Sequence, residues 1–233
     1  MRIVVAMSGG VDSSVAAAQL VTAGHDVIGL SMQLYDQQPH ENAFGGCCSH
    51  EDLHDARRVA ALLGIPHYTV NFKEEFDAAV VAPFAREYAS GRTPIPCVQC
   101  NGDLKFRHLL DRANALGAHR VATGHYAQLS SSDDDISEIE LHRGTDPRKD
   151  QSYVLFGIGR KLLQRMLLPV GGYQKAWIRE RASHLGLDVA QKRDSQEICF
   201  VTTGKHDQFI RQRRQDVDTS GDIVTTDGQV VGQ

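Results

Sequence analysis

Short apolar runs alternate with amphipathic stretches in the first half of the chain. Apolar, β-branched runs predict strands at residues 3–7, 27–32 and 67–70. Helical periodicity fills residues 13–23 and 51–63, and Gly24 and Gly64 stand where these helices should end. This alternation predicts an α/β fold, in which a parallel sheet carries helices on both faces.

The pattern continues to residue 141 with a break in the middle. Helical periodicity returns at residues 74–88 and 101–116, a fourth strand is expected at 120–123, and an edge strand at 138–141. Pro94 and Pro96 interrupt helix and strand alike between the two helices. Residues 130–135 are polar and acidic, which is typical of a loop.

Beyond Gly144 the pattern changes to short helices. We expect helices at residues 161–166, 175–185 and 206–214, and a hairpin of two short strands around Asp227-Gly228. The expected organisation is therefore a first domain over residues 1–159, a small helical domain over 160–216 and the start of a β-rich module over 217–233.

The composition is that of an ordinary globular protein. Of the 233 residues, 41% are hydrophobic and 23% are charged. No apolar run has the length of a membrane span, and the N-terminus reaches its glycines too soon for a signal peptide. We therefore expect a cytoplasmic protein with no membrane partner.

Charge is distributed unevenly along the chain. The net charge is −4, but residues 1–140 carry 10 Lys and Arg against 18 Asp and Glu, whereas residues 141–233 carry 15 against 11. The basic second half favours a polyanionic partner, and a solvated basic surface without a partner is the alternative.

The segment from Ala6 to Ser13, Ala-Met-Ser-Gly-Gly-Val-Asp-Ser, lies between the first strand and the first helix. Gly9 and Gly10 let the backbone approach an anion, and Ser8, Ser13 and the first helical amides offer donors. The spacing differs from both common nucleotide-binding glycine motifs. It resembles the pyrophosphate loop of enzymes that split ATP into AMP and pyrophosphate, and a plain glycine turn is the alternative.

Two more strand ends belong to the same expected site, because ligands of open parallel sheets bind beyond the carboxyl ends of the strands. Met32 ends the second strand, where it either packs on an adenine or belongs to the core. Gly124 follows the fourth strand and would let a nucleotide approach the backbone. The neighbouring His125 either contacts phosphate or caps the turn.

The cysteines point to a reaction class. The five cysteines include the adjacent pair Cys47 and Cys48 and the Cys97-x-x-Cys100 motif, which indicate reactive thiols or metal ligands rather than a disulfide framework. We expect Cys100 directly before a helix, where the dipole lowers the pKa of a thiol. With Cys199 and an ATP site, this pair suggests that ATP adenylates a carbonyl oxygen and a persulfide delivers sulfur. Two inert buried thiols are the alternative, and Cys47 and Cys48 are expected to have no role.

Seven motifs occur in one order along the chain: residues 8–13, 47–49, 91–94, 100–106, 124–126, 149–153 and 194–200. Together they resemble the tRNA-specific 2-thiouridylases, a family of the pyrophosphate-loop ATPase superfamily with an adenine-nucleotide alpha-hydrolase-like fold. The resemblance runs from the first strand almost to Gln233.

The resemblance implies a role for each matching residue. ATP, with Mg²⁺, would bind Ala6, Met7, Ser8, Gly9, Gly10, Val11, Asp12, Ser13, Met32 and Gly124. Cys199 would carry a persulfide from a sulfur-donor protein, and Cys100 would be its partner thiol. The tRNA contacts would be Lys149, Asp150 and Gln151, with Ile95, Pro96 and Cys97 near the target base. The product would be 2-thiouridine at the wobble position of tRNAs for Lys, Glu and Gln.

This chain departs from the family in two places. Family members commonly have Asn-Pro-Asp where this chain has Ile95-Pro96-Cys97, so Cys97, Cys100 and Cys199 could together hold an iron–sulfur cluster. We favour the persulfide route over this alternative. The family also has a C-terminal β-barrel, so the chain is expected either to be truncated or to be naturally short, with weaker tRNA binding.

Two other functions remain as alternatives. One is an amidotransferase-type synthetase that adenylates a carboxylate and needs no cysteine pair. The other is a tRNA- or ATP-binding fragment without activity.

Overall fold

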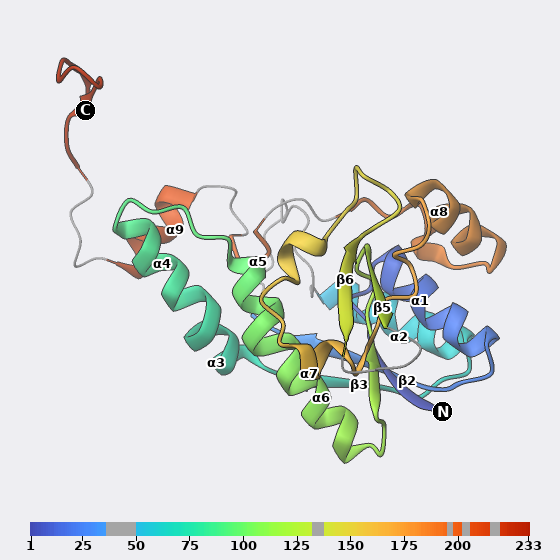
Figure 1. Cartoon of the computed structure of the whole chain (residues 1–233). Coiled ribbons are helices and arrows are strands. Elements are labelled where there is room, and N and C mark those ends of the chain that lie inside the picture. The colour runs from blue at the N-terminus through green and yellow to red at the C-terminus, as the bar shows by residue number, and fades with distance from the viewer. Residues whose placement is uncertain (36–49, 132–137, 195–197, 202–205, 215–219) are drawn as a thin grey trace.

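A computed structural model of the chain describes residues 1–35, 50–131, 138–194, 198–201, 206–214 and 220–233. Its main sheet has five parallel strands in the order β3-β2-β1-β4-β7 (Figure 1). These strands are β1 (Arg2–Ala6), β2 (Asp26–Gln33), β3 (His67–Asn71), β4 (Arg120–Ala122) and β7 (Met166–Leu167). The predicted parallel sheet is confirmed, and the carboxyl ends of its strands meet at one edge.

Successive residues of β1 pack into two different cores, as expected for a strand covered on both faces. Ile3 and Val5 pack with α1 (Val11–Thr22), α2 (His50–Leu62) and α8 (Lys175–His184). Val4 packs in the other core with α4 (Ala82–Ala89) and α6 (Phe106–Ala115). The helices therefore lie on both faces of the sheet, as predicted.

The two long helices of the middle region each contain a π-helical turn. The first consists of α3 (Lys73–Phe76), η1 (Asp77–Val81) and α4, and the second of α5 (Pro96–Gln99), η2 (Cys100–Lys105) and α6. The second helix starts at Pro96 instead of Asn101, because proline suits a first helical position, where no amide donor is needed. Cys100 therefore lies inside a helical run, and the prediction that it directly precedes a helix is wrong.

The segment after residue 160 contributes to the same layers. The helix expected at 161–166 is shorter, since α7 (Arg160–Leu163) ends early and Met166–Leu167 form β7 beside β4. Helix α8 contacts α1. Short helices η4 (Asp188–Gln191) and α9 (His206–Arg213) complete this part of the chain, and η3 (Ser152–Val154) precedes it. The division at residues 159 and 216 stays a prediction.

Within the described residues, two antiparallel hairpins lie outside the main sheet. The expected edge strand pairs with a neighbour, because β6 (Ile139–Arg143) forms a two-stranded sheet with β5 (Ala127–Ser131). Strands β8 (Ile223–Val224) and β9 (Val230–Gly232) form the predicted hairpin around Gly228. Across the described residues, every helix is too short or too polar to cross a bilayer.

Candidate functional site

A cavity of about 450 Å³ opens at the carboxyl ends of the strands, where ligands of open α/β sheets bind. Its walls come from the segment after β1, the ends of β2 and β4, helices α5 and η2, and residues 192–194 and 198–200. Of the cofactor residues expected from sequence, all but Gly9 line it. Lys149, Gln151, Pro96, Cys97, Cys100 and Cys199 line it as well, whereas Ile95 and Asp150 do not.

The loop from Ser8 to Ser13, called the phosphate loop below, is closed by its own hydrogen bonds. The backbone N–H of Ser8 donates to Ser13 Oγ at 3.2 Å, and Ser13 Oγ donates to the Gly10 carbonyl oxygen at 3.1 Å. Gly9 has φ +76°, and a Cβ there would lie 2.1 Å from the Asp52 carbonyl oxygen. Only glycine fits this position. The N-terminus of α1 thereby faces the cavity, which favours an anion.

Gly124 has a packing role that the sequence did not indicate. A Cβ at Gly124 would lie 2.5 Å from the Ser13 backbone nitrogen. The start of α1 therefore needs a glycine here, whether or not a nucleotide is bound. Met32 lies on the cavity wall and is also buried in the core, so the two interpretations of this residue are compatible.

Lys175 joins the phosphate loop to a second carboxylate. Its Nζ lies 2.7 Å from both carboxylate oxygens of Asp12 and 2.8 Å from Asp194 Oδ1, and its side chain is 11% exposed. The Tyr126 hydroxyl donates to Asp12 Oδ1 at 2.7 Å. Burial, followed by the negative charge of Asp12, raises the pKa of Tyr126 well above its usual value. Tyr126 therefore acts as a neutral donor.

Lys192 holds the other side of the phosphate loop. Its Nζ donates to Asp52 Oδ1 at 2.6 Å, to Asp55 Oδ2 and to the Gly9 carbonyl oxygen at 3.2 Å. Burial opposes its charge, but the hydrogen bonds to both carboxylates leave the pKa of Lys192 raised. The loop is thus flanked by two charged lysines.

Asp194 is the centre of a cationic cluster. Its carboxylate accepts from Lys149 Nζ at 2.6 Å and from Arg179 at 3.0 Å, in addition to Lys175. Burial alone would raise the pKa of Asp194, but the hydrogen bonds from Lys149 and Lys175 keep it below the usual value. Lys149, expected to contact tRNA, therefore has an ionic partner in the protein.

The other two residues of the expected tRNA motif shape the backbone. Asp150 Oδ1 accepts from the backbone N–H groups of Gly144 and Ser152 at 3.0 and 3.2 Å. Gln151 is joined to Tyr126 in both directions, since its N–H donates to the Tyr126 carbonyl oxygen and its Oε1 accepts the Tyr126 N–H. These bonds fix the turn that precedes η3.

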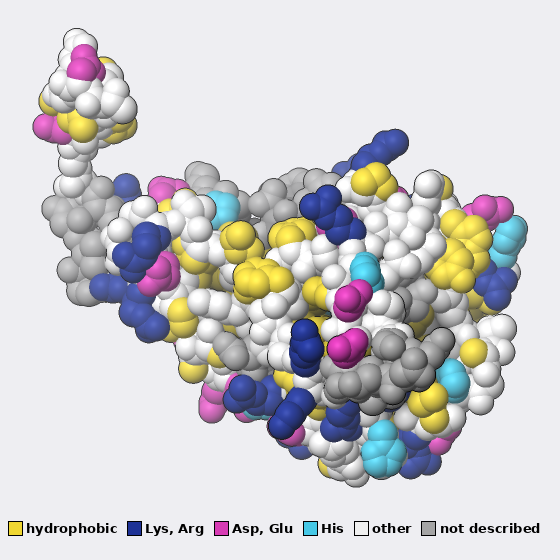
Figure 2. Space-filling model, in the orientation of Figure 1, with side chains coloured by type: hydrophobic (Ala, Val, Ile, Leu, Met, Phe, Trp, Pro, Cys, Tyr) yellow, Lys and Arg dark blue, Asp and Glu magenta, His cyan; other side chains and the backbone are white. Residues whose placement is uncertain are grey.

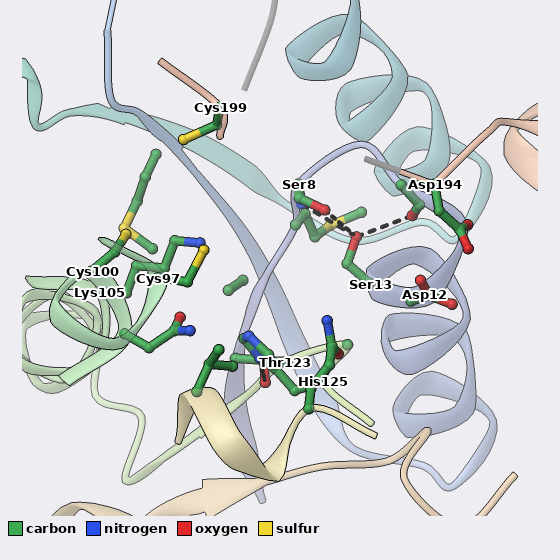
Figure 3. A pocket seen from close by; sticks show the side chains of 18 of the residues that line it. Ser8, Asp12, Ser13, Cys97, Cys100, Lys105, Thr123, His125, Asp194 and Cys199 are labelled. Carbon is green, nitrogen blue, oxygen red and sulfur yellow. Dashed lines mark hydrogen bonds between the residues drawn. The ribbon is translucent and has the colours of Figure 1, made fainter. Parts of the chain in front are cut away.

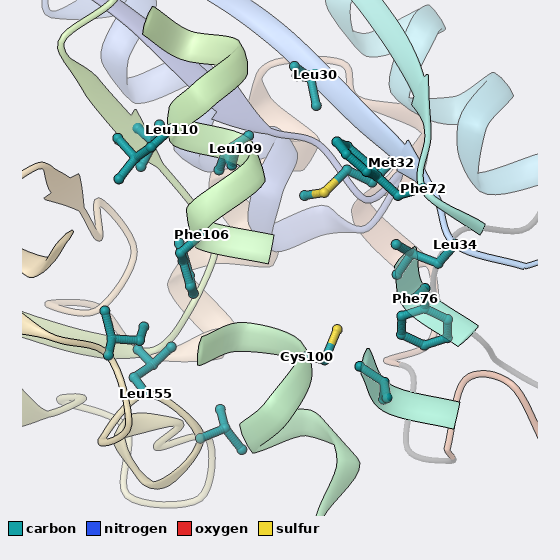
Figure 4. Packing of buried hydrophobic residues seen from close by; sticks show 14 of the residues in the cluster. Leu30, Met32, Leu34, Phe72, Phe76, Cys100, Phe106, Leu109, Leu110 and Leu155 are labelled. Carbon is teal, nitrogen blue, oxygen red and sulfur yellow. The ribbon is translucent and has the colours of Figure 1, made fainter. Parts of the chain in front are cut away.

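The three cysteines lie across the cavity from the phosphate loop (Figure 3). Cys97 is exposed, Cys199 half-buried and Cys100 buried, and none of them forms a disulfide. Cys100 belongs to the core cluster that includes Phe76 and Phe106 (Figure 4). Cys47 and Cys48 lie outside the described residues.

The donor set does not fit a metal cluster in this arrangement. No three His, Cys, Asp or Glu side chains in the described parts of the chain are grouped so that they could hold a metal ion. Cys97, Cys100 and Cys199 are all described, so an iron–sulfur cluster on these thiols would require them to move. The cluster alternative stays a prediction.

The cavity carries an excess of positive charge. Its described lining includes the cations Lys105, Lys149, Lys175, Lys192 and Arg193, and the acids Asp12, Asp52 and Asp194. Sequence reasoning missed the roles of Lys175, Lys192 and Tyr126. In the sequence, Lys175 is recognisable only as the first residue of an expected helix, and the local pattern does not relate it to Asp12.

Comparisons with known proteins agree with this geometry. The family model of the tRNA methyl transferase HUP domain matches residues 1–203. The tRNA-specific 2-thiouridylase MnmA of Heliobacterium modesticaldum is 48% identical over 231 residues, which cover 99% of this chain and 60% of the relative. The protein of the same name from Geobacter metallireducens is 50% identical over 235 residues, covering 99% and 63%. The chain thus spans about three fifths of the length of these relatives.

A solved structure, that of a 4-thiouridine synthetase–RNA complex with bound ATP, superposes with a TM-score of 0.54 at 18% identity. The superposition covers 93% of this chain and 50% of that chain, and it supports the fold. The family match over most of the chain and the identity to curated relatives agree with the motifs read from the sequence. The chain belongs to the tRNA methyl transferase HUP domain family and is a relative of the tRNA-specific 2-thiouridylases.

Proposed function

We propose that this protein catalyses the ATP-dependent 2-thiolation of the wobble uridine of tRNA. One observation carries the proposal: a single cavity has a phosphate loop on one wall and Cys100 and Cys199 on the opposite wall (Figure 3). A uracil C2 oxygen is a poor leaving group, so its replacement by sulfur needs both an activating nucleotide and a sulfur carrier.

The phosphate loop is suited to the triphosphate of ATP. The amides that open α1, together with Lys175 and Lys192, supply donors and positive charge. Met32 and Gly124 would line the side of the nucleotide. Mg²⁺ would be held by the phosphates and by the carboxylate of Asp12, once that carboxylate exchanges its bond to Lys175, and it would neutralise charge on the leaving pyrophosphate.

The chemistry divides into two displacements. In the first, the uridine C2 oxygen attacks the α-phosphorus of ATP and pyrophosphate leaves, which gives an adenylated base. In the second, the terminal sulfur of a Cys199 persulfide attacks C2 and AMP leaves with the oxygen. The Cys100 thiolate then attacks Cys199 Sγ, the 2-thiouridine is released, and a Cys100–Cys199 disulfide remains for a thiol reductant to open.

The partners follow from this chemistry. The tRNAs for Lys, Glu and Gln are the proposed acceptors, and a sulfur-donor protein in the cytoplasm is proposed to load Cys199. Lys149, Asp150 and Gln151 are proposed to serve the tRNA contact, with Ile95, Pro96 and Cys97 near the target base. Lys149 and Gln151 line the cavity, whereas Asp150 supports the backbone beside it.

Mass spectrometry of the tRNA tests the proposal. The protein is incubated with tRNA, ATP, Mg²⁺ and a persulfide donor that loads Cys199, and the nucleosides are analysed for 2-thiouridine. We expect Cys100→Ser and Cys199→Ser to abolish the product, with Cys48→Ser as the matched control that retains it.

Two outcomes would contradict the proposal. Full activity of both serine variants on a carboxylate substrate would favour an amidotransferase-type synthetase. Binding of ATP and tRNA without pyrophosphate release would indicate that the chain is a binding fragment without activity.

A further inference from the structure

Two exposed aromatic side chains belong to one turn, and the first of them borders the cavity. Tyr153 is 59% exposed and Phe156 is 72% exposed, and Tyr153 also lines the cavity beside Pro96 and Cys97. Their segment, η3 and the turn after it, contacts α5. In the space-filling view, hydrophobic side chains lie at the surface in this region, where Figure 1 labels α5 (Figure 2).

The turn that carries these two aromatics is held rigidly. On one side, Asp150 accepts from the Ser152 backbone N–H and, at 2.9 Å, from the Ser152 hydroxyl. Within the turn, Val154 and Leu155 are buried in the core. The turn is therefore anchored to the core on the side opposite to the exposed Tyr153 and Phe156. A rigid, exposed aromatic loses little entropy when a planar ligand stacks on it.

The chain that follows Asp150 is basic through this turn and beyond it. Residues 151–179 contain five Lys and Arg and no Asp or Glu. Arg160 and Lys161 are the first two residues of α7, which begins four residues after Phe156, and both are exposed. Aromatic side chains flanked by cations at the entrance of a reaction cavity match single-stranded nucleic acid, in which bases stack and phosphates need positive charge.

We propose that Tyr153 and Phe156 form a stacking platform for the unpaired bases next to the reacting uridine, with Arg160 and Lys161 on the adjoining phosphates. The platform rests on the proposed function, since it needs RNA at the cavity. It offers stacking partners to the loop bases when the reacting base leaves its own stack to enter the cavity. Tyr153 and Phe156 act as positioning residues for the RNA.

The first test is RNA binding by the whole purified chain. Fluorescence anisotropy measures the affinity for a labelled anticodon stem-loop RNA at fixed salt. We expect Tyr153→Ala and Phe156→Ala each to weaken binding about 5- to 150-fold, the range for loss of one stacked base. Tyr153→Phe and Phe156→Tyr should bind as the parent does. Tyr68→Ala is the matched control, because Tyr68 is a half-exposed tyrosine on β3.

An abasic RNA separates stacking from a general loss of structure. When the base beside the target uridine is removed, the parent should bind the RNA more weakly. The Phe156→Ala or Tyr153→Ala variant should bind the abasic RNA as well as it binds the intact RNA, because its stacking contact is already absent. ATP binding should be retained by all variants, since the proposed donors to ATP are Lys175, Lys192 and the amides that open α1.

The outcomes of these tests are distinguishable. If the parent binds no RNA at all, the proposed function fails and the platform fails with it. If the parent binds RNA and both alanine variants bind equally well, only the platform is overturned. A change of oligomeric state in the alanine variants, with unchanged RNA affinity, would assign the two aromatics to a protein contact and would also overturn it.

Discussion

Lys175 Nζ lies 2.7 Å from both carboxylate oxygens of Asp12, although the two residues are 163 positions apart in the chain. This pair fastens the first residue of α8 to the first turn of α1. Because Lys175 also contacts Asp194, the phosphate loop is linked to the segment that leads to Cys199. Replacing Lys175 would leave the Asp12 carboxylate without its lysine, whereas Asp194 would keep Lys149 and Arg179.

Replacing Asp12 tests the phosphate loop. Asp12→Asn keeps an oxygen that can accept the Tyr126 hydroxyl but removes the charge that faces Lys175. We expect pyrophosphate release in the presence of tRNA to be lost in both Asp12→Asn and Asp12→Ala. Loss of charged hydrogen bonds should lower the free energy of unfolding by about 1.5–3 kcal/mol. Asp26→Asn, which breaks an exposed pair with Arg2, is the control. Parental pyrophosphate release by Asp12→Asn would show that this carboxylate has no part in the reaction.

Gly124→Ala tests how closely α1 must approach β4. The new Cβ would lie 2.5 Å from the Ser13 nitrogen, and the neighbour is backbone. We expect a loss of about 1–3 kcal/mol in the free energy of unfolding, typical of overpacking, and weaker ATP binding, because α1 must shift. Urea denaturation and calorimetric titration measure the two effects. Gly159→Ala, whose Cβ meets nothing within 4 Å, should leave ATP binding unchanged. Unaltered stability of Gly124→Ala would refute the packing argument.

The cationic cluster around Asp194 predicts how stability depends on pH. The folded protein holds the pKa of Asp194 below its usual value, so the unfolded chain binds the proton more readily. The stabilisation is therefore present above the usual Asp pKa and is lost as the pH falls through the lower folded value. Denaturation curves from neutral to acidic pH should show this loss. Asp194→Asn should be less stable at neutral pH and less sensitive to acid, and an equally steep acid loss in that variant would contradict the assignment.

Salt dependence tests the tRNA contact of the basic second half. If Lys149 leaves Asp194 to bind a phosphate, affinity for tRNA should fall steeply with salt in the parent, because counterions are released. In Lys149→Met the slope should decrease by about one. Lys149→Glu should bind more weakly still, because it places a second carboxylate beside Asp194. A flat salt dependence, or parental affinity in Lys149→Glu, would argue against this contact.

Cys97 decides between the persulfide and the cluster routes. We expect Cys97→Asp to thiolate tRNA when a persulfide donor is supplied, without iron, since the persulfide route uses only Cys100 and Cys199. If a cluster formed instead, Cys97→Ala would lose iron, brown absorbance and activity together. Anaerobic reconstitution with iron and sulfide, followed by absorbance and activity measurements, separates the two. Active, colourless, iron-free parent protein would eliminate the cluster.

The sequence predicts well what depends on local pattern. Ile3, Val4 and Val5 form a continuous apolar run because both faces of β1 are covered, and such a run is recognisable without a structure. Gly9 is also predictable from its local motif, because a positive φ favours glycine. The position of Cys100 was misjudged because Pro96, which breaks many helices, here begins one.

Long-range relationships leave no comparable trace. Met166 and Leu167 form a strand of only two residues, too short to show a periodicity, and they pair because β4 offers an open edge. Lys175 is one basic residue among several in its segment, and only the fold brings it to Asp12. The phosphate loop could thus be located from the sequence, whereas the cations that flank it could not.

The sheet order has a consequence for synthesis on the ribosome. β1 is central and its neighbours β2 and β4 are complete by Ala122, but β7 joins β4 only after Leu167 has emerged. Until then β4 remains an edge strand, open to pairing with other chains. Lys175 and Lys192 are translated later still, so a nascent chain exposes its phosphate loop well before the cations that flank it exist. Competence for nucleotide binding should therefore arise abruptly, near the end of translation of this segment.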